Sequence, residues 1–295
     1  MKRVLTAAVL IPLVLLAIFK APAILLAVLV GAVAILTLHE FLTIAQAYGI
    51  RALRQPTYVL TGLLFLYVGL VHSKPVTEIG GFGIAMAAVL ALAPFVFLAI
   101  TMGREQLASA YPAAAASTFA LAYIGLPLLL LVQLRQQWAG AFLLVYLLIV
   151  VWAGDTFAYY VGKNFGRHRM APRVSPKKSW EGAAASFFGS VAVGTLLFWY
   201  AYDISFWLWR NGLIEREQGY LALDRPPLLL VILLSAAINI AAQLGDLVES
   251  AIKRGAGVKD SGAILPGHGG MLDRIDALLF AAPVLWFYAA WRVMS

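Results

Sequence analysis

The stretch 139-AGAFLLVYLLIVVWAGDTFAYYV-161 decides the fold class. Asp155 is its only charged residue, and it exceeds the roughly 20 residues that a helix needs to cross about 30 Å of hydrocarbon. The stretch is therefore predicted to be a transmembrane helix with Asp155 at membrane depth. Because an ionised group is costly there, membrane proteins keep such residues mainly for function or for pairing.

Similar apolar runs fill the chain on both sides of this stretch. Of the 295 residues, 62% are hydrophobic and 12% are charged, whereas a soluble domain carries about 25% charged residues. Mean hydropathy is +0.88. We therefore predict an all-α, polytopic transmembrane helical bundle of about nine helices. The expected spans are 4–19, 22–38, 57–72, 81–101, 113–132, 139–161, 182–201, 227–248 and 275–294.

Basic residues are spread unevenly over the segments between these spans. With a cytoplasmic N-terminus and nine crossings, 15 of the 22 lysines and arginines fall on the cytoplasmic side, as the positive-inside rule requires. The C-terminus is then external. Residues 1–23 also resemble a signal peptide, but a second apolar run follows at once, which favours an uncleaved helix.

The net charge of +8 is explained by this topology and by contact with anionic membrane lipids, so no nucleic-acid partner is expected. The chain has no cysteine, which excludes disulfides and thiolate metal sites. Residues 199–225 combine Trp and Tyr with mixed charges, and are predicted to be a structural loop beside an interfacial aromatic belt.

Polar residues concentrate in two segments, 154–182 and 245–276, both on the predicted cytoplasmic side. The chain is therefore divided into N-terminal transmembrane helices, 1–135, with about five spans, and a C-terminal catalytic region, 136–295. The cytoplasmic loops of that region are expected at 162–181 and 249–274.

The second polar segment combines a helical face with a glycine-rich turn. Asp246, Glu249, Ser250 and Lys253 follow an i, i+3, i+4, i+7 spacing, so they share one face of a helix. Seven glycines and prolines between 255 and 270 then exclude a regular helix and let the backbone approach a ligand. Asp273 and Asp276 are expected in the first turn of the last helix, where the helix dipole stabilises carboxylates.

Each of these residues also has a simpler interpretation. Asp273 and Asp276 are compatible with helix caps, and His268 is compatible with a loop histidine bonded to backbone. The positive-inside rule alone would explain Lys253, Arg254 and Lys259. The combination of carboxylates, basic groups and a glycine-rich turn instead indicates a site for Mg²⁺ and phosphate, since Mg²⁺ usually bridges a few carboxylates to substrate phosphates.

The first polar segment is less specific. Asp155 is interpreted as a further metal or polar-network residue, or as the structural partner of an arginine. Lys177, Lys178 and Ser179 are interpreted as ligands of a phosphate or lipid headgroup, or as part of a positively charged cytoplasmic loop.

The stretch 250-SAIKRGAGVKDSGAILPGHGGMLDRID-276 resembles the signature of the phosphatidate cytidylyltransferases, also called CDP-diacylglycerol synthases. The family pattern, S-x-x-K-R-x4-K-D-x-x-x-x-[LIF]-P-x-H-G-G-x-x-D-R-x-D, is matched at every fixed position. Asp155, the run 175–179 and Glu181-Gly182 resemble the family's upstream elements.

The resemblance implies transfer of a cytidylyl group from CTP to phosphatidate, which gives CDP-diacylglycerol and pyrophosphate, with Mg²⁺ as cofactor. It implies an integral protein of the cytoplasmic (inner) membrane with its active site facing the cytoplasm. Asp246, Asp273 and Lys253 would be catalytic. Asp246 and Asp273 would bind the metal, with Asp276 and Asp155 as further candidates. The substrate-binding residues would be Ser250, Arg254, Lys259, His268, Gly269, Gly270, Arg274, Lys177, Lys178 and Ser179.

Other functions are weighed against this hypothesis. A CDP-alcohol phosphatidyltransferase would carry D-G-x-x-A-R before its later aspartates, and that motif does not precede Asp273. A lipid kinase is a second related membrane enzyme. A transporter would favour broken helices in two matching halves, whereas the polar residues here lie in the C-terminal half. Small residues in the helices permit a homodimer.

Overall fold

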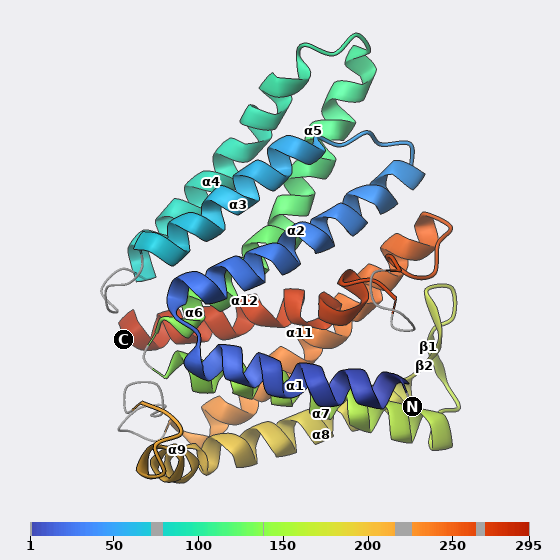
Figure 1. Cartoon of the computed structure of the whole chain (residues 1–295). Helices are drawn as coiled ribbons and strands as arrows, with labels where there is room; N and C mark the ends of the chain where they lie inside the picture. Colours follow the sequence, from blue (N-terminus) through green and yellow to red (C-terminus); the bar gives the residue numbers. More distant parts are fainter. Residues whose placement is uncertain (1, 72–78, 138, 216–225, 264–268, 295) are drawn as a thin grey trace. The chain divides into compact units, whose positions relative to one another are not determined.

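A computed structural model of the chain describes residues 2–71, 79–137, 139–215, 226–263 and 269–294 (Figure 1). The fold forms two compact units that interleave along the sequence. Unit 1 comprises Met1–Ala21, Leu134–Ala251 and Asp276–Ser295, and unit 2 comprises Pro22–Gln133 and Ile252–Ile275. The predicted division at 135/136 follows chain order instead, and its assignment of catalysis to 136–295 stays a prediction.

Unit 1 is built around helix α7 (Gly140–Phe165), which packs on α1 (Lys2–Lys20) and, along most of its length, on α8 (Trp180–Trp199). Gly154, Gly189 and Gly194 stand where any larger side chain would overlap a neighbouring helix. Small residues let helices approach closely where lipid provides no hydrophobic driving force. The unit also holds α9 (Ala201–Arg210) and most of α11 (Leu228–Gly255) and α12 (Leu272–Met294).

Unit 2 consists of α2 (Ala23–Ala47), α3 (Arg54–Val71), α4 (Ile79–Thr101) and a long helical run. The run comprises η1 (Leu107–Ser109), α5 (Ala110–Ala120), a π-helical turn η2 (Leu121–Gly125) and α6 (Leu126–Arg135). Helices α2 and α3 pack side by side, as do α4 and α5 (Figure 1). The last turn of α11, the first turn of α12 and the described residues between them, 256–263 and 269–271, complete the unit. These residues between the two helices are called the glycine-rich segment.

The prediction of a polytopic helical membrane protein is confirmed. Each of the nine expected spans corresponds to a helix or helical run, and seven helices of the described residues are long and apolar enough to cross a membrane. Nine crossings stay a prediction, because the seven do not include α1 or α3.

Two details of the prediction need correction. The stretch 199–225 is not a loop throughout, because α9 occupies Ala201–Arg210 within it. The helices α2, α7 and α11 also extend beyond the predicted spans, to Ala47, Phe165 and Gly255. Apolar composition marks only the part of a helix that meets lipid, so it cannot locate ends that are polar. The predicted helical face of Asp246, Glu249, Ser250 and Lys253 is confirmed, since all four lie in α11.

Candidate functional site

The first polar segment forms a β-hairpin between α7 and α8. Strand β1 (Arg169–Ala171) pairs antiparallel with β2 (Ser175–Ser179) (Figure 1). Ser179 ends the hairpin and begins α8: its buried hydroxyl accepts a hydrogen bond from the Gly182 N–H at 3.2 Å, as an N-cap residue does. Ser179 therefore has a structural function here, and its predicted contact with substrate stays a prediction.

The hairpin brings Lys178 to the acidic side chains of unit 1. The Lys178 ammonium lies 2.7 Å from Oδ2 of Asp246, and the Ser250 hydroxyl lies 3.4 Å from Oδ1 of the same carboxylate. The charge of Asp155 is attracted by Lys178 and repelled by Asp246. We call Asp155, Lys178 and Asp246 the charge cluster. It joins α7, β2 and α11, and confirms that the first polar segment lies beside the α11 part of the second.

A network of neutral polar groups supports the helices that carry this cluster. The Asn239 amide of α11 donates to the Ser186 and Ser190 hydroxyls of α8, at 2.9 and 2.8 Å. Ser190 donates in turn to the Val150 carbonyl of α7, at 2.7 Å. Gly154, the neighbour of Asp155, leaves the space that this network occupies, because an added Cβ would lie within 2.8 Å of all three side chains.

A second arrangement surrounds Asp273 in unit 2. The Lys253 ammonium donates to Oδ1 of Asp273. Oδ2 accepts from the backbone N–H groups of Ser261 and Gly270, at 3.0 and 2.8 Å. Asp273 thus closes the glycine-rich segment onto the start of α12 and holds a buried lysine.

Glu40 completes this arrangement from α2, and the sequence analysis did not select it. Its carboxylate is 3% exposed and accepts three hydrogen bonds: from the Ser261 hydroxyl at 2.8 Å, the Met271 N–H at 2.8 Å and the Leu272 N–H at 2.9 Å. The sequence could have revealed Glu40, because it is an acidic residue inside an apolar helix, and such a residue in a membrane protein is a candidate for a functional role. We call Glu40, Lys253, Ser261 and Asp273 the loop network.

The glycines of the signature fit around these carboxylates. Gly269 has φ +77°, and an added Cβ would overlap Oδ2 of Asp273. At Gly270 the overlap would be with Ser261 and Glu40. A side chain at either position would displace an oxygen that orders the segment, so close approach requires both glycines, and backbone conformation also requires Gly269.

The other predicted site residues have varied surroundings. Asp276 is the fifth residue of α12, just beyond the first turn that was predicted for it, and Oδ1 accepts from the Ala277 N–H at 2.8 Å. His268 lies outside the described residues. Four predicted phosphate ligands expose their side chains: Lys177, Arg254, Lys259 and Arg274.

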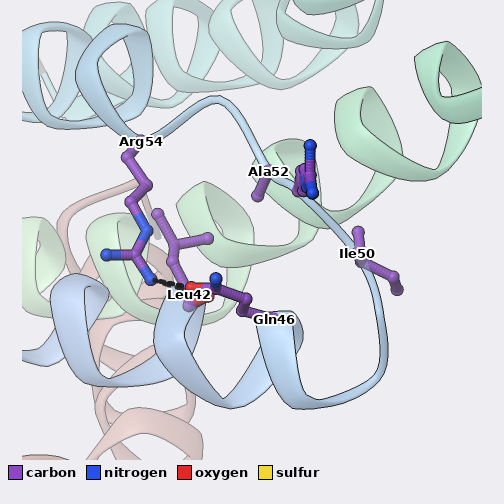
Figure 2. Close-up of a pocket in the computed structure, with 6 residues that line it drawn as sticks. Leu42, Gln46, Ile50, Ala52 and Arg54 are labelled. Carbon is purple, nitrogen blue, oxygen red and sulfur yellow. Dashed lines mark hydrogen bonds between the residues drawn. The ribbon is translucent and has the colours of Figure 1, made fainter. Parts of the chain in front are cut away.

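A pocket of about 320 Å³ lies in unit 2 at the turn between α2 and α3. Figure 2 shows Arg54 reaching back toward Leu42 and Gln46, whose oxygens accept hydrogen bonds at 3.5 and 3.0 Å. None of the predicted site residues lines this pocket. Arg54 at this pocket links α3 to α2. Because the pocket is lined by none of the predicted site residues, it is not part of the candidate site.

The charge cluster fits a magnesium ion better than the loop network does. No group of three or more His, Asp and Glu side chains with ligand spacing exists among the described residues, but Mg²⁺ is commonly held by one or two carboxylates together with substrate phosphates. Asp246 offers one such carboxylate beside Lys178, and its charge interacts with that of Asp155. Asp273 and Asp246 belong to different units, and their joint binding of one ion stays a prediction.

Fold and site together define a helical integral membrane protein with clustered acidic and basic side chains. The chain belongs to the cytidylyltransferase family, whose model matches residues 1–291. It is similar to the phosphatidate cytidylyltransferase of Thermotoga maritima, with 34% identity over 282 residues, which are 96% of this chain and 93% of that protein.

Similar proteins of the same name occur in Haemophilus influenzae and Bacillus subtilis. They are 38% identical over 154 residues and 36% identical over 174 residues. These alignments cover 52% and 59% of this chain, and about half of each relative, 48% and 57%.

Proposed function

We propose that this protein is a phosphatidate cytidylyltransferase, which transfers a cytidylyl group from CTP to phosphatidate. The family match over residues 1–291 carries the proposal, and the nearly full-length similarity to the Thermotoga maritima enzyme supports it. The complete signature between Ser250 and Asp276 agrees with both.

In this reaction a phosphate oxygen of phosphatidate attacks the α-phosphorus of CTP. The new O–P bond forms as the bond from the α-phosphorus to the bridging oxygen breaks, and pyrophosphate leaves with the electron pair. A phosphate monoester has a second pKa of about 6, so it is mostly dianionic at neutral pH and needs no general base. The protein must therefore align two anions and offset their charge.

The basic residues of both units are suited to this task. Lys178 is half-buried beside the acidic pair, where its ammonium can change partner from Asp246 to a phosphate oxygen. Lys253 is held by Asp273 at the start of the glycine-rich segment. Arg254, Lys259 and Arg274 are exposed and would contact phosphates of CTP as they arrive from water.

Mg²⁺ is proposed as the cofactor, with Asp246 and Asp155 as its ligands in unit 1, while the role of Asp273 as a ligand stays a prediction from the sequence. When bound, it would neutralise phosphate charge and stabilise the leaving pyrophosphate. Carboxylate oxygens are the ligands that this ion prefers. Chelation of divalent cations is expected to abolish turnover, and added Mg²⁺ to restore it.

The site is proposed to face the cytoplasm, where CTP is found, in an inner membrane with a cytoplasmic N-terminus and an external C-terminus. The distribution of basic residues supports this orientation. Single cysteines can be placed at both ends of the chain, which has none of its own. Labelling of only the C-terminal cysteine from outside is expected, and equal labelling of both ends would contradict the nine crossings.

The activity is tested with purified protein in detergent, radiolabelled CTP and phosphatidate. Formation of labelled CDP-diacylglycerol with release of pyrophosphate is expected. Diacylglycerol with labelled ATP serves as the control for a lipid kinase, and CDP-diacylglycerol with an alcohol as the control for a phosphatidyltransferase. Activity in either control without cytidylyl transfer would overturn the proposal.

A further inference from the structure

Glu40 is the only acidic residue of α2, and it lies among apolar side chains near the end of that helix. Its carboxylate is almost fully buried, yet three donors of the glycine-rich segment and of α12 converge on it. A carboxylate only accepts hydrogen bonds, and its two oxygens have room for about four. The side chain therefore matches the set of donors that it meets.

Two of these donors, the N–H groups of Met271 and Leu272, lie at the start of α12. The N–H groups of Met271 and Leu272 have no acceptor inside a helix that begins at Leu272, so their acceptor must come from outside the helix. Glu40 supplies it from 231 and 232 residues away in the sequence. The cap of α12 is thus a long-range contact, which cannot be predicted from a local sequence pattern.

Glu40 is also connected to residues of the signature, Ser261 and Asp273. Ser261 donates its hydroxyl to Glu40 and its N–H to Asp273, so it joins the two carboxylates. Asp273 in turn receives the Lys253 ammonium. A chain of hydrogen bonds thus runs from Glu40 through Ser261 and Asp273 to Lys253.

We infer that Glu40 is a positioning residue, which holds the glycine-rich segment and, through Asp273, orients Lys253 for its phosphate. The effect of Glu40 on catalysis rests on the proposed function, whereas its contact with the glycine-rich segment does not. Glu40 itself does not touch the reacting atoms.

The test compares Glu40→Gln with Glu40→Asp and with Thr37→Val in the full-length protein. Gln has the same shape but replaces one acceptor oxygen by a donor, so in either amide orientation at least one of the three donors loses its acceptor. Asp keeps both acceptors on a shorter side chain. Thr37 is equally buried on α2 and bonds only to the Val33 carbonyl, so its substitution is the matched control.

Two readouts are measured. For Glu40→Gln, kcat/KM for cytidylyl transfer is expected to fall at least about tenfold, Glu40→Asp is expected to retain more activity, and Thr37→Val is expected to match the wild type. Amide hydrogen exchange at Met271 and Leu272 is expected to become at least about tenfold faster in Glu40→Gln, with unchanged exchange in α3.

The outcomes separate the two proposals. An inactive wild-type protein whose Met271 and Leu272 amides lose protection in Glu40→Gln would reject the enzymatic function and retain the positioning contact. Wild-type activity and protection in Glu40→Gln would overturn the inference, since a residue that merely fills space tolerates an isosteric amide. If Glu40→Gln does not fold, Ser261→Ala removes only the hydroxyl donor, and unchanged activity and exchange in that variant would overturn it as well.

Discussion

Asp246 of the charge cluster and Asp273 of the loop network carry the same functional group in different settings. The Asp246 side chain is 38% exposed and meets Lys178 at 2.7 Å, whereas that of Asp273 is 10% exposed and binds both a buried lysine and two backbone N–H groups. A partly exposed pair exchanges partners readily, because each member is hydrated when separated. A buried, fully bonded carboxylate instead fixes the conformation around it.

The two aspartates therefore serve two tasks, although only Asp273 lies inside the signature 250–276. Residues of α11 in unit 1 present charge that a ligand can use, while residues around the glycine-rich segment use much of their hydrogen-bonding capacity on one another.

Asp273→Asn is expected to have the largest effect, because it acts on both activity and stability. Removing one partner of a buried ion pair commonly costs about 3–5 kcal/mol, and Lys253 is 8% exposed. Turnover is expected to fall at least about 10²-fold, together with the thermal midpoint in detergent. A variant that loses activity at wild-type stability would place Asp273 with Asp246 instead.

Asp246→Asn is expected to cut turnover as strongly but to leave stability within about 1 kcal/mol of the wild type, since exposed ion pairs contribute little to folding. Loss of an electrostatic stabiliser of the reaction commonly costs about 3 kcal/mol of barrier, or about 10²-fold. Activity assays and thermal unfolding on the same preparation measure both. Wild-type turnover would remove Asp246 from the site.

Gly269→Ala and Gly257→Ala form a matched pair. Both glycines have positive φ, +77° and +73°, so both substitutions incur a backbone cost of about 1–2 kcal/mol. Only at Gly269 does the new Cβ overlap the Asp273 carboxylate; at Gly257 nothing lies within 4 Å. Gly269→Ala is therefore expected to lose roughly tenfold more activity, equivalent to about 1.4 kcal/mol. Equal losses would mean that the contact with Asp273 has no catalytic consequence.

Asn239→Ala is expected to have the smallest effect. Hydrogen bonds between helices in a membrane contribute about 0.6 kcal/mol on average, and Asn239 makes several, so a loss of about 1–2 kcal/mol of stability is expected. Thermal unfolding in detergent measures it, with exposed Asn164 substituted by Ala as the control. A loss of stability no larger than that of the control would show that packing alone holds α8 and α11 together.

The sequence predicted the helical membrane fold and the two polar segments, because apolar length and clustered charge are local properties. It placed Asp246 and Lys253 on one helical face for the same reason. It missed Glu40 and Asn239, whose significance depends on partners distant in the sequence. Ser179 was predicted as a ligand of a phosphate or lipid headgroup, which stays a prediction, and the sequence did not reveal that its hydroxyl caps α8. A lysine pair followed by serine fits both functions, and only the geometry of the hairpin reveals the cap.

We propose that the charge cluster around Asp246 is where the protein binds its divalent cation. Mn²⁺ binding to the purified protein, followed by electron paramagnetic resonance, tests it without reference to turnover. Asp246→Asn is expected to weaken binding at least about tenfold, which is about 1.4 kcal/mol. The control is Asp260→Asn, because the Asp260 side chain is exposed in the glycine-rich segment, and this variant is expected to bind Mn²⁺ as the wild type does. Undiminished binding by Asp246→Asn, or an equal loss in both variants, would contradict the account.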